Sequence, residues 1–110
     1  MIPQIPIDLL NDNITLKSYI KGEQEFVFRD DEIIENVKVE LNHNLTMDNG
    51  SNQEEINTTL FVDAVNSKYS NLENFTLQSQ VIFNDNIYTI EKVEVLRVHN
   101  NIHHLEVTLC

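Results

Sequence analysis

The sequence contains one cysteine, two glycines, two prolines and no tryptophan among its 110 residues. A single cysteine excludes a disulfide within the chain, so a hydrophobic core has to stabilise the fold. Two glycines are too few for a glycine-rich phosphate-binding loop. Both prolines, Pro3 and Pro6, lie near the N-terminus. The rest of the chain therefore has no proline to interrupt a strand.

Basic residues are also scarce: 7 lysines and arginines stand against 18 acidic residues, for a net charge of −11. The basic residues are scattered singly, whereas binding to a nucleic-acid backbone or an anionic membrane surface needs them clustered. No segment approaches the roughly 18 apolar residues of a membrane-spanning helix. The N-terminus lacks the basic and apolar regions of a secretion signal. We therefore expect a protein made in the cytoplasm of its cell that binds neither nucleic acid nor membranes.

Hydrophobic periodicity indicates strands. Residues 14–20 and 37–41 alternate between apolar and polar side chains, which is typical of strands with one buried face. Residues 25–29 and 58–65 are rich in aromatic and β-branched types and predict further strands. A chain of this length forms a single domain with one core.

Two hairpins are predicted in the C-terminal third. The first joins residues 81–83 to residues 87–90 across an Asn-Asp-Asn segment, and the second joins residues 93–98 to residues 102–109 across Asn100 and Asn101. Asparagine and aspartate tolerate the left-handed backbone conformation that tight hairpin turns require.

The apolar positions change phase between these hairpins. Tyr88 and Ile90 occupy even positions, whereas Val93 and Val95 occupy odd ones. In a continuous strand such a slip requires an extra residue, so we predict a β-bulge or a sharp coil at Glu91 and Lys92.

Together these patterns predict an all-β fold, a small antiparallel β-barrel or sandwich, in a single domain covering residues 1–110. Residues 1–12 are predicted to form an N-terminal arm. Residues 42–54 are almost entirely polar and are predicted to form one long loop. Helices are expected only as short pieces, near residues 6–12 and 67–75.

The residues that carry chemistry do not converge on a catalytic or metal site. Four histidines are present (His43, His99, His103 and His104). His103 and His104 are adjacent in a predicted strand and should point to opposite faces, whereas a metal site needs three or four convergent ligands. The acidic runs at residues 30–32 and 54–55 lie beside predicted loops, where a solvated edge is expected. We therefore predict no enzyme activity, no metal and no cofactor.

Cys110 permits two interpretations. It can form a bridge to another chain, or it can be part of a frayed chain end, and we expect the second.

Several segments carry a family resemblance. Residues 5–10 read Ile-Pro-Ile-Asp-Leu-Leu, residues 14–19 read Ile-Thr-Leu-Lys-Ser-Tyr, and residues 34–39 read Ile-Glu-Asn-Val-Lys-Val. With the hairpin at residues 81–93, they resemble the small "minor capsid protein" family of Gram-positive tailed phages and prophages. That family usually has glycine at the position of Asn86. The resemblance extends over most of the chain, from Ile5 to Leu109.

The resemblance implies a structural protein of the head–tail junction: a head-completion component of the stopper or adaptor kind, located in the virion neck. It implies a small β-barrel that forms a ring with its own copies and contacts the portal or adaptor and the tail-completion proteins. The arm and the polar loop are then expected to make the assembly contacts. The candidate residues are Ile2, Ile5, Ile7, Leu9 and Leu10 in the arm, and Asp48, Asn49, Gly50, Ser51 and Asn52 in the loop.

The charge also fits a different class of protein, an acidic non-catalytic binding or inhibitor module that caps a basic protein partner. Such a module would bind its partner in a salt-sensitive way and would not form a ring. In a ring, the same acidic surface would repel packaged DNA from the channel.

Overall fold

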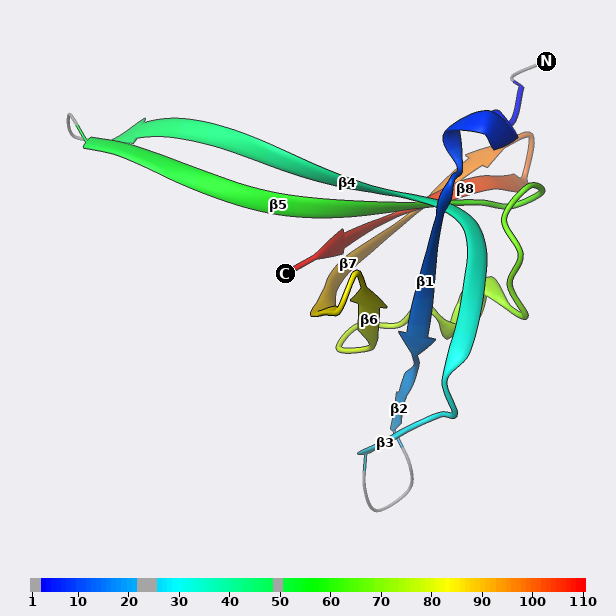
Figure 1. Ribbon diagram of the computed structural model, residues 1–110. Coiled ribbons are helices and arrows are strands. Elements are labelled where there is room, and N and C mark those ends of the chain that lie inside the picture. Colours follow the sequence, from blue (N-terminus) through cyan, green and yellow to red (C-terminus); the bar gives the residue numbers. More distant parts are fainter. Residues whose placement is uncertain (1–2, 22–25, 49–50) are drawn as a thin grey trace.

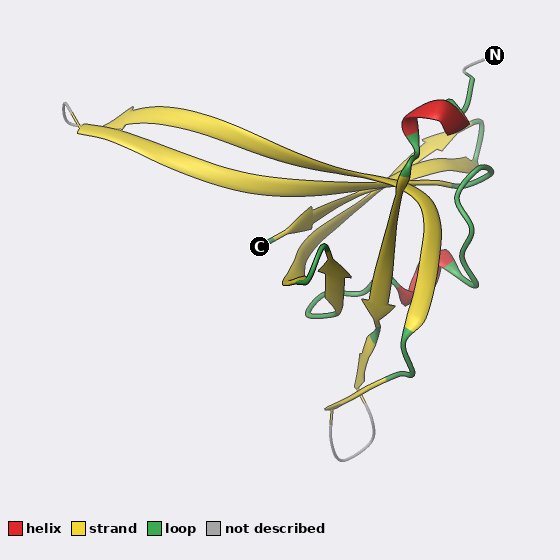
Figure 2. Ribbon diagram, viewed as in Figure 1, coloured by secondary structure: helices red, strands yellow, loops and turns green. Residues whose placement is uncertain are grey.

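The computed structural model of the protein, which describes residues 3–21, 26–48 and 51–110, is a closed antiparallel β-barrel (Figures 1 and 2). The strand order around the barrel is β1-β4-β5-β8-β7-β6. The barrel strands are β1 (Asp12–Lys17), β4 (Glu32–Asp48), β5 (Ser51–Asp63), β6 (Gln80–Phe83), β7 (Asn86–Val98) and β8 (Asn101–Leu109). A small hairpin of β2 (Tyr19–Lys21) and β3 (Phe26–Phe28) extends from β1 (Figure 1). The prediction of an all-β barrel is confirmed.

Helical structure within the described residues is limited to two short 3-10 helices, η1 (Ile7–Leu9) and η2 (Leu72–Asn74). Both fall inside the segments predicted to hold short helices. Asn71 begins η2 as its N-cap, because its side chain accepts a hydrogen bond from the backbone N–H of Glu73 at 2.9 Å.

The core follows from the alternation of each barrel strand. In β8, every second residue from His103 to Leu109 is buried, as expected when successive side chains point to opposite faces. β1, β4 and β5 contribute in the same way, and the connection between β5 and β6 adds Phe75. The buried apolar cluster consists of Ile14, Leu16, Ile34, Val37, Leu60, Val62, Phe75, Val81, Ile90, Leu105, Val107 and Leu109.

The predicted bulge is confirmed. β7 runs unbroken through the phase change, and its pairing with β8 shifts between Ile90 and Lys92. Before the shift β7 pairs with β6, and after it β7 pairs only with β8 within the described residues. The bulge therefore lies at the point where β7 stops pairing with β6 and continues along β8 alone among the described strands.

The turn residues agree with the prediction in the first hairpin and differ by one position in the second. Asn84 and Asp85 have φ values of 50° and 66°, so they occupy the left-handed positions. In the second hairpin these positions are His99 and Asn100, with φ values of 51° and 68°, because Val98 pairs with Asn101. The predicted turn at Asn100 and Asn101 is therefore wrong by one residue.

Asn86 is not a left-handed position. It is the first residue of β7 and pairs with Phe83 in the extended conformation. The glycine that the resembled family places here is therefore not required by the backbone of this turn.

The predicted long loop over residues 42–54 is wrong. Residues 42–48 belong to β4 and residues 51–54 to β5, and the two strands pair without a break from Val37 opposite Val62 to Asp48 opposite Ser51. The barrel sets this register, and each further pair then satisfies backbone N–H and C=O groups without needing apolar side chains. The predicted N-terminal arm is present as residues 3–11, which precede β1.

The expected fraying at Cys110 is also wrong. The backbone N–H of Cys110 donates to the carbonyl of Thr89 at 3.0 Å, and the N–H of Thr89 donates to the carbonyl of Cys110 at 2.9 Å. These two bonds extend the pairing of β7 and β8. The thiol itself is exposed and forms no disulfide.

Candidate assembly surfaces

The N-terminal arm is fixed to the barrel by Asp63, the last residue of β5. The Asp63 side chain is fully buried, at 0% exposure. Its Oδ1 accepts a hydrogen bond from the backbone N–H of Ile5 at 3.0 Å, and Gln4 Nε2 donates to both carboxylate oxygens at 3.2 Å. In return, the side-chain amide of Asn66 donates to the carbonyl of Ile5 at 2.8 Å. The arm is therefore held by polar contacts rather than by a strand pairing.

The same carboxylate closes the turn after β5. Its Oδ2 accepts from the backbone N–H groups of Val65 at 3.0 Å and Asn66 at 2.8 Å. Burial by itself raises the pKa of Asp63, but the hydrogen bonds from Asn66, Ile5, Val65 and Gln4 outweigh it and lower that pKa below its ordinary value. Asp63 is thus a charged group in the barrel wall, stabilised by donors from two separate segments.

A histidine pair on β8 supports the first residues of the arm. His103 Nε2 lies 2.8 Å from the carbonyl oxygen of Pro3, and the Nδ1 atoms of His103 and His104 lie 2.7 Å apart. A carbonyl only accepts, so His103 Nε2 donates to Pro3, and one of the two Nδ1 atoms donates to the other. His103 is buried and His104 half-buried, as alternation requires, yet the rings turn toward each other. The two residues thus alternate between the faces of β8 as predicted, and their rings still meet through the two Nδ1 atoms.

The structure places the candidate arm residues in different environments. Ile7 and Leu9, in η1, are 54% and 58% exposed, and Ile5 is half-buried. Leu10, just before β1, is 1% exposed and is therefore buried, although it is not part of the apolar cluster inside the barrel. Ile2 lies outside the described residues. The arm therefore presents Ile7 and Leu9 to the outside.

A groove runs along the outer wall of the barrel beside the arm. It has a volume of about 460 Å³ and is lined by Ile5 and Leu9 of the arm, Lys38 and Glu40 of β4, Phe61 of β5 and His104 of β8. Because Asp63 holds Ile5, one side of this groove is set by the anchor described above.

The outer parts of β4 and β5 form a two-stranded ribbon, which we define as residues 42–48 and 51–57. β1 pairs with β4 only as far as Val37, and β8 pairs with β5 only from Thr58 onward. Within the described residues the ribbon strands therefore pair only with each other, and the ribbon projects far from the barrel (Figure 1). An isolated two-stranded ribbon is marginally stable in water, so a surface that covers it would stabilise it.

The candidate loop residues lie at the outer end of this ribbon. Asp48 pairs with Ser51, and Asn52 pairs with Met47. Asn49 and Gly50 lie outside the described residues. These candidates are therefore part of a projecting hairpin rather than of a polar loop.

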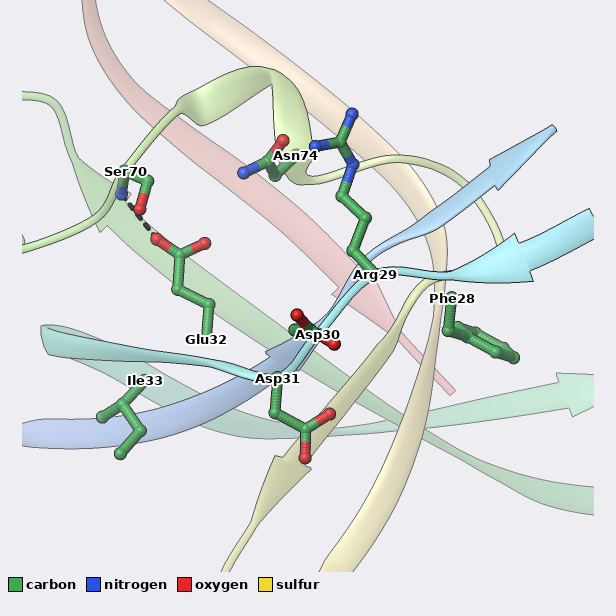
Figure 3. A pocket seen from close by; sticks show the side chains of 8 residues that line it. All are labelled: Phe28, Arg29, Asp30, Asp31, Glu32, Ile33, Ser70 and Asn74. Carbon is green, nitrogen blue, oxygen red and sulfur yellow. Dashed lines mark hydrogen bonds between the residues drawn. The ribbon is translucent and has the colours of Figure 1, made fainter. Parts of the chain in front are cut away.

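An acidic cleft lies between the start of β4 and the segment that contains η2 (Figure 3). It has a volume of about 820 Å³ and is lined by Phe28, Arg29, Asp30, Asp31, Glu32, Ile33, Ser70 and Asn74. Glu32 accepts a hydrogen bond from the backbone N–H of Ser70 at 2.6 Å, and Asp31 lies 3.7 Å from Lys17 Nζ. The cleft is open to solvent and combines acidic groups with the exposed apolar side chains of Phe28 and Ile33.

No group of three histidine, cysteine or acidic side chains is placed to hold a metal ion within the described residues. No helix in that part of the chain has the length and apolar character needed to cross a membrane.

Sequence reasoning missed the anchor at Asp63. A signal was present, since Asp63 interrupts the apolar segment at residues 58–65, where a carboxylate requires partners. Its partner Gln4 lies 59 positions away in the sequence, so pattern alone could not identify it.

Comparison with known proteins gives one match. A protein-family model described as minor capsid protein matches residues 6–109. No curated protein and no solved structure shows a significant match to the chain.

Proposed function

The chain belongs to the minor capsid protein family, and we propose that it is a head-completion component of the head–tail junction of a tailed phage. Family membership implies a structural, non-enzymatic role as a component of a virion. The finer proposal places the protein in the virion neck, as a stopper-like or adaptor-like ring between the portal or adaptor and the tail-completion proteins.

The observation that carries this proposal is the ribbon. A ring protein needs a rigid body and an element that reaches a neighbour, and here a closed barrel carries a hairpin that extends well beyond it (Figure 1). The barrel end of the hairpin is fixed by pairing with β1 and β8, whereas its outer part pairs with nothing else in the described chain.

The charge supports the same role. A net charge of −11 favours repulsion of packaged DNA over adhesion to it. The exposed acidic residues include Asp30 and Asp31 in the acidic cleft and Glu91 and Glu94 on β7. A channel lined by such a surface would let DNA pass without binding it.

Deletion of the gene from its phage tests the proposal. We expect tailless heads beside separate tails in negative-stain electron micrographs, with reduced DNA retention in the heads. Complementation with the wild-type gene should restore tailed particles. Normal yields of infectious particles from the deletion strain would refute the role at the junction.

The acidic cleft favours a second candidate function, a binding module for a basic protein. A charge-driven complex at Asp30 and Asp31 would weaken strongly as salt rises. Pull-down from infected cells at low and high salt distinguishes the two functions, because the module would recover a soluble basic partner, whereas the ring protein would recover portal and tail-completion proteins.

A further inference from the structure

The second half of β7, after the bulge, is an uncovered part of the barrel wall. In β7 only Ile90 is fully buried, whereas β8 alternates regularly between buried and half-buried positions. Glu94 and Val95 are successive residues, and both are exposed. Because successive side chains of a strand point to opposite faces, both faces of this part of β7 reach solvent.

Val95 shows which face of β7 is incompletely covered. It pairs with Leu105, which is 1% exposed, and directly paired residues lie on the same face of a sheet. Val95 therefore belongs to the face that forms the core elsewhere, yet it is 45% exposed. Val95 is therefore an apolar side chain on the core-facing side of β7 that the rest of the single chain does not fully cover.

The free edge of β7 lies at the same place. β6 pairs with β7 only at residues 86–89, and Gln78 extends this pairing to Ile90. Across the part of the chain that the structure describes, residues 92–98 make backbone hydrogen bonds to β8 and to no strand on the other side. A strand could therefore add to this edge.

A slot accompanies the free edge. It has a volume of about 220 Å³ and is lined by Leu72, Glu73, Phe75, Val93, Val95, Arg97, Ile102 and Leu105. Its lining is mostly apolar, and Arg97 is exposed and forms no ion pair with any described residue. An extended segment that fits here should supply apolar side chains and a carboxylate.

We propose that the occupant is the ribbon of a second copy of this chain, with its β4 strand added antiparallel to residues 92–98 of β7. Residues 42–48 match this edge in length and have no other strand beside them in the described structure. They carry Leu45 and Met47 on alternate positions, and in the register that sets Leu45 opposite Val95, Met47 comes opposite Val93. Residues 42–57 contain Asp48, Glu54 and Glu55 and no lysine or arginine, so the ribbon is acidic, and in this register Asp48 comes opposite Lys92 of β7.

This contact is of the head-to-tail type, because the ribbon of one copy meets a different surface on the next. Head-to-tail contacts generate rings when the rotation between copies closes. The inference thus rests on the ring assembly proposed above and specifies the two surfaces that join its members. It also accounts for two incomplete features at once, the unsupported ribbon and the uncovered half of β7.

Disulfide trapping in phage particles tests the contact. The test variant carries Leu45→Cys and Val95→Cys in a Cys110→Ser background. Particles that contain it are oxidised and run on non-reducing gels. We expect a ladder of covalent dimers and higher multimers that disappears on reduction. The matched control replaces Val95→Cys by Ile87→Cys, because Ile87 is 65% exposed but lies in the half of β7 that β6 already pairs. The Leu45 and Val95 pair should give at least tenfold more multimer than this control.

Particles that contain the double variant but show no more multimer than the control would overturn the contact while leaving the junction role intact. If the deletion phage assembles normally, the junction role fails independently of the trapping result.

Hydrogen exchange on the unmodified protein keeps the inference testable if the cysteine variants fail to assemble. The amides of residues 92–98 that point away from β8 should exchange at least tenfold more slowly in purified necks than in the isolated chain, because a new strand would bond the free edge. Equal exchange in the two states would refute strand addition at β7.

Discussion

Ile5 and Asp63 are joined by a hydrogen bond in which the backbone N–H of Ile5 donates to Asp63 Oδ1 at 3.0 Å, across 58 positions of sequence. The bond fixes the N-terminal arm at the point where β5 ends, and the other oxygen of the same carboxylate fixes the turn after β5. One buried charge thus organises two surface segments. The groove beside Ile5 takes its shape from the same contact.

Replacement of the carboxylate by an amide should be strongly destabilising. Asp63→Asn retains one acceptor oxygen but places an N–H₂ group against backbone donors, so several buried donors lose their partner. We expect a loss of roughly 2–4 kcal/mol in the free energy of unfolding, measured by urea denaturation. The control is Asp85→Asn, which makes the same chemical change at an exposed turn residue and should alter stability by less than about 0.5 kcal/mol. Equal effects of the two variants would contradict the anchor.

The lowered pKa of Asp63 predicts a component of acid sensitivity. Its pKa in the folded state lies below the unfolded value of about 3.9, so below that value the unfolded chain binds more protons than the folded one. The stabilisation by Asp63 is therefore complete above about pH 5 and is lost as the pH falls through the folded pKa.

Urea midpoints at neutral and acid pH measure this component. Other carboxylates contribute equally to the pH dependence of wild type and of Asp63→Asn. The informative quantity is therefore the difference in stability between these two proteins at each pH. Wild type should lose more stability than the variant between pH 7 and pH 3, and the two curves should approach each other at the acid end. Parallel curves would show that Asp63 has the same pKa in both states.

The sequence predicted the barrel where side-chain alternation and turn chemistry agree. Residues 81–98 illustrate this, because the turn at Asn84 and Asp85 and the bulge after Ile90 both follow from local pattern. The ribbon could not be predicted in this way. Its sequence is mostly polar and holds too few apolar residues to predict a strand, and its register is inherited from the barrel.

The arm shows a second limit of pattern reasoning. Ile5, Ile7, Leu9 and Leu10 form an apolar series in the sequence, but the structure buries Leu10 and leaves Ile7 and Leu9 exposed. The difference depends on where Asp63 and His103 hold the chain, and those contacts join residues about 60 to 100 positions apart. Only the fold brings them together.

Removal of the ribbon should separate folding from assembly. We consider a variant in which an Asn-Gly turn replaces residues 43–56 and joins Asn42 to Asn57. Every core residue that the structure describes lies outside the ribbon, so the free energy of unfolding should change by less than about 1 kcal/mol. In the phage, the same variant should fail to restore tailed particles to a deletion strain.

The matched control is Leu77→Ala, which shortens a side chain that is 58% exposed and distant in sequence from the ribbon. It should restore normal particle yields. A ribbon deletion that also restores them would show that the ribbon is dispensable for assembly.

Truncation of a side chain inside the barrel should lower the free energy of unfolding much more than removal of the ribbon. Leu60 of β5 is 0% exposed within the apolar cluster, so Leu60→Ala should lower the free energy of unfolding by roughly 2–5 kcal/mol. Ile33→Ala is the control, because Ile33 is 68% exposed and should lose less than about 1 kcal/mol. Urea denaturation followed by circular dichroism compares the two, and similar losses would mean that Leu60 does not occupy the core.

In the turn between β6 and β7, glycine substitutions at two neighbouring positions should change the free energy of unfolding in opposite directions. Asp85 has a φ of 66°, a conformation that costs an L-residue more than glycine, so Asp85→Gly should stabilise the protein by roughly 0.5 kcal/mol. Asn86 is already in the strand and pairs with Phe83, so Asn86→Gly should destabilise by roughly 0.5–1 kcal/mol through the entropy of the unfolded chain. Thermal and urea unfolding of both variants decides the point. If Asn86→Gly proves the stabilising change, the left-handed position lies one residue later than the structure places it, and the register of the whole β6–β7 hairpin shifts with it.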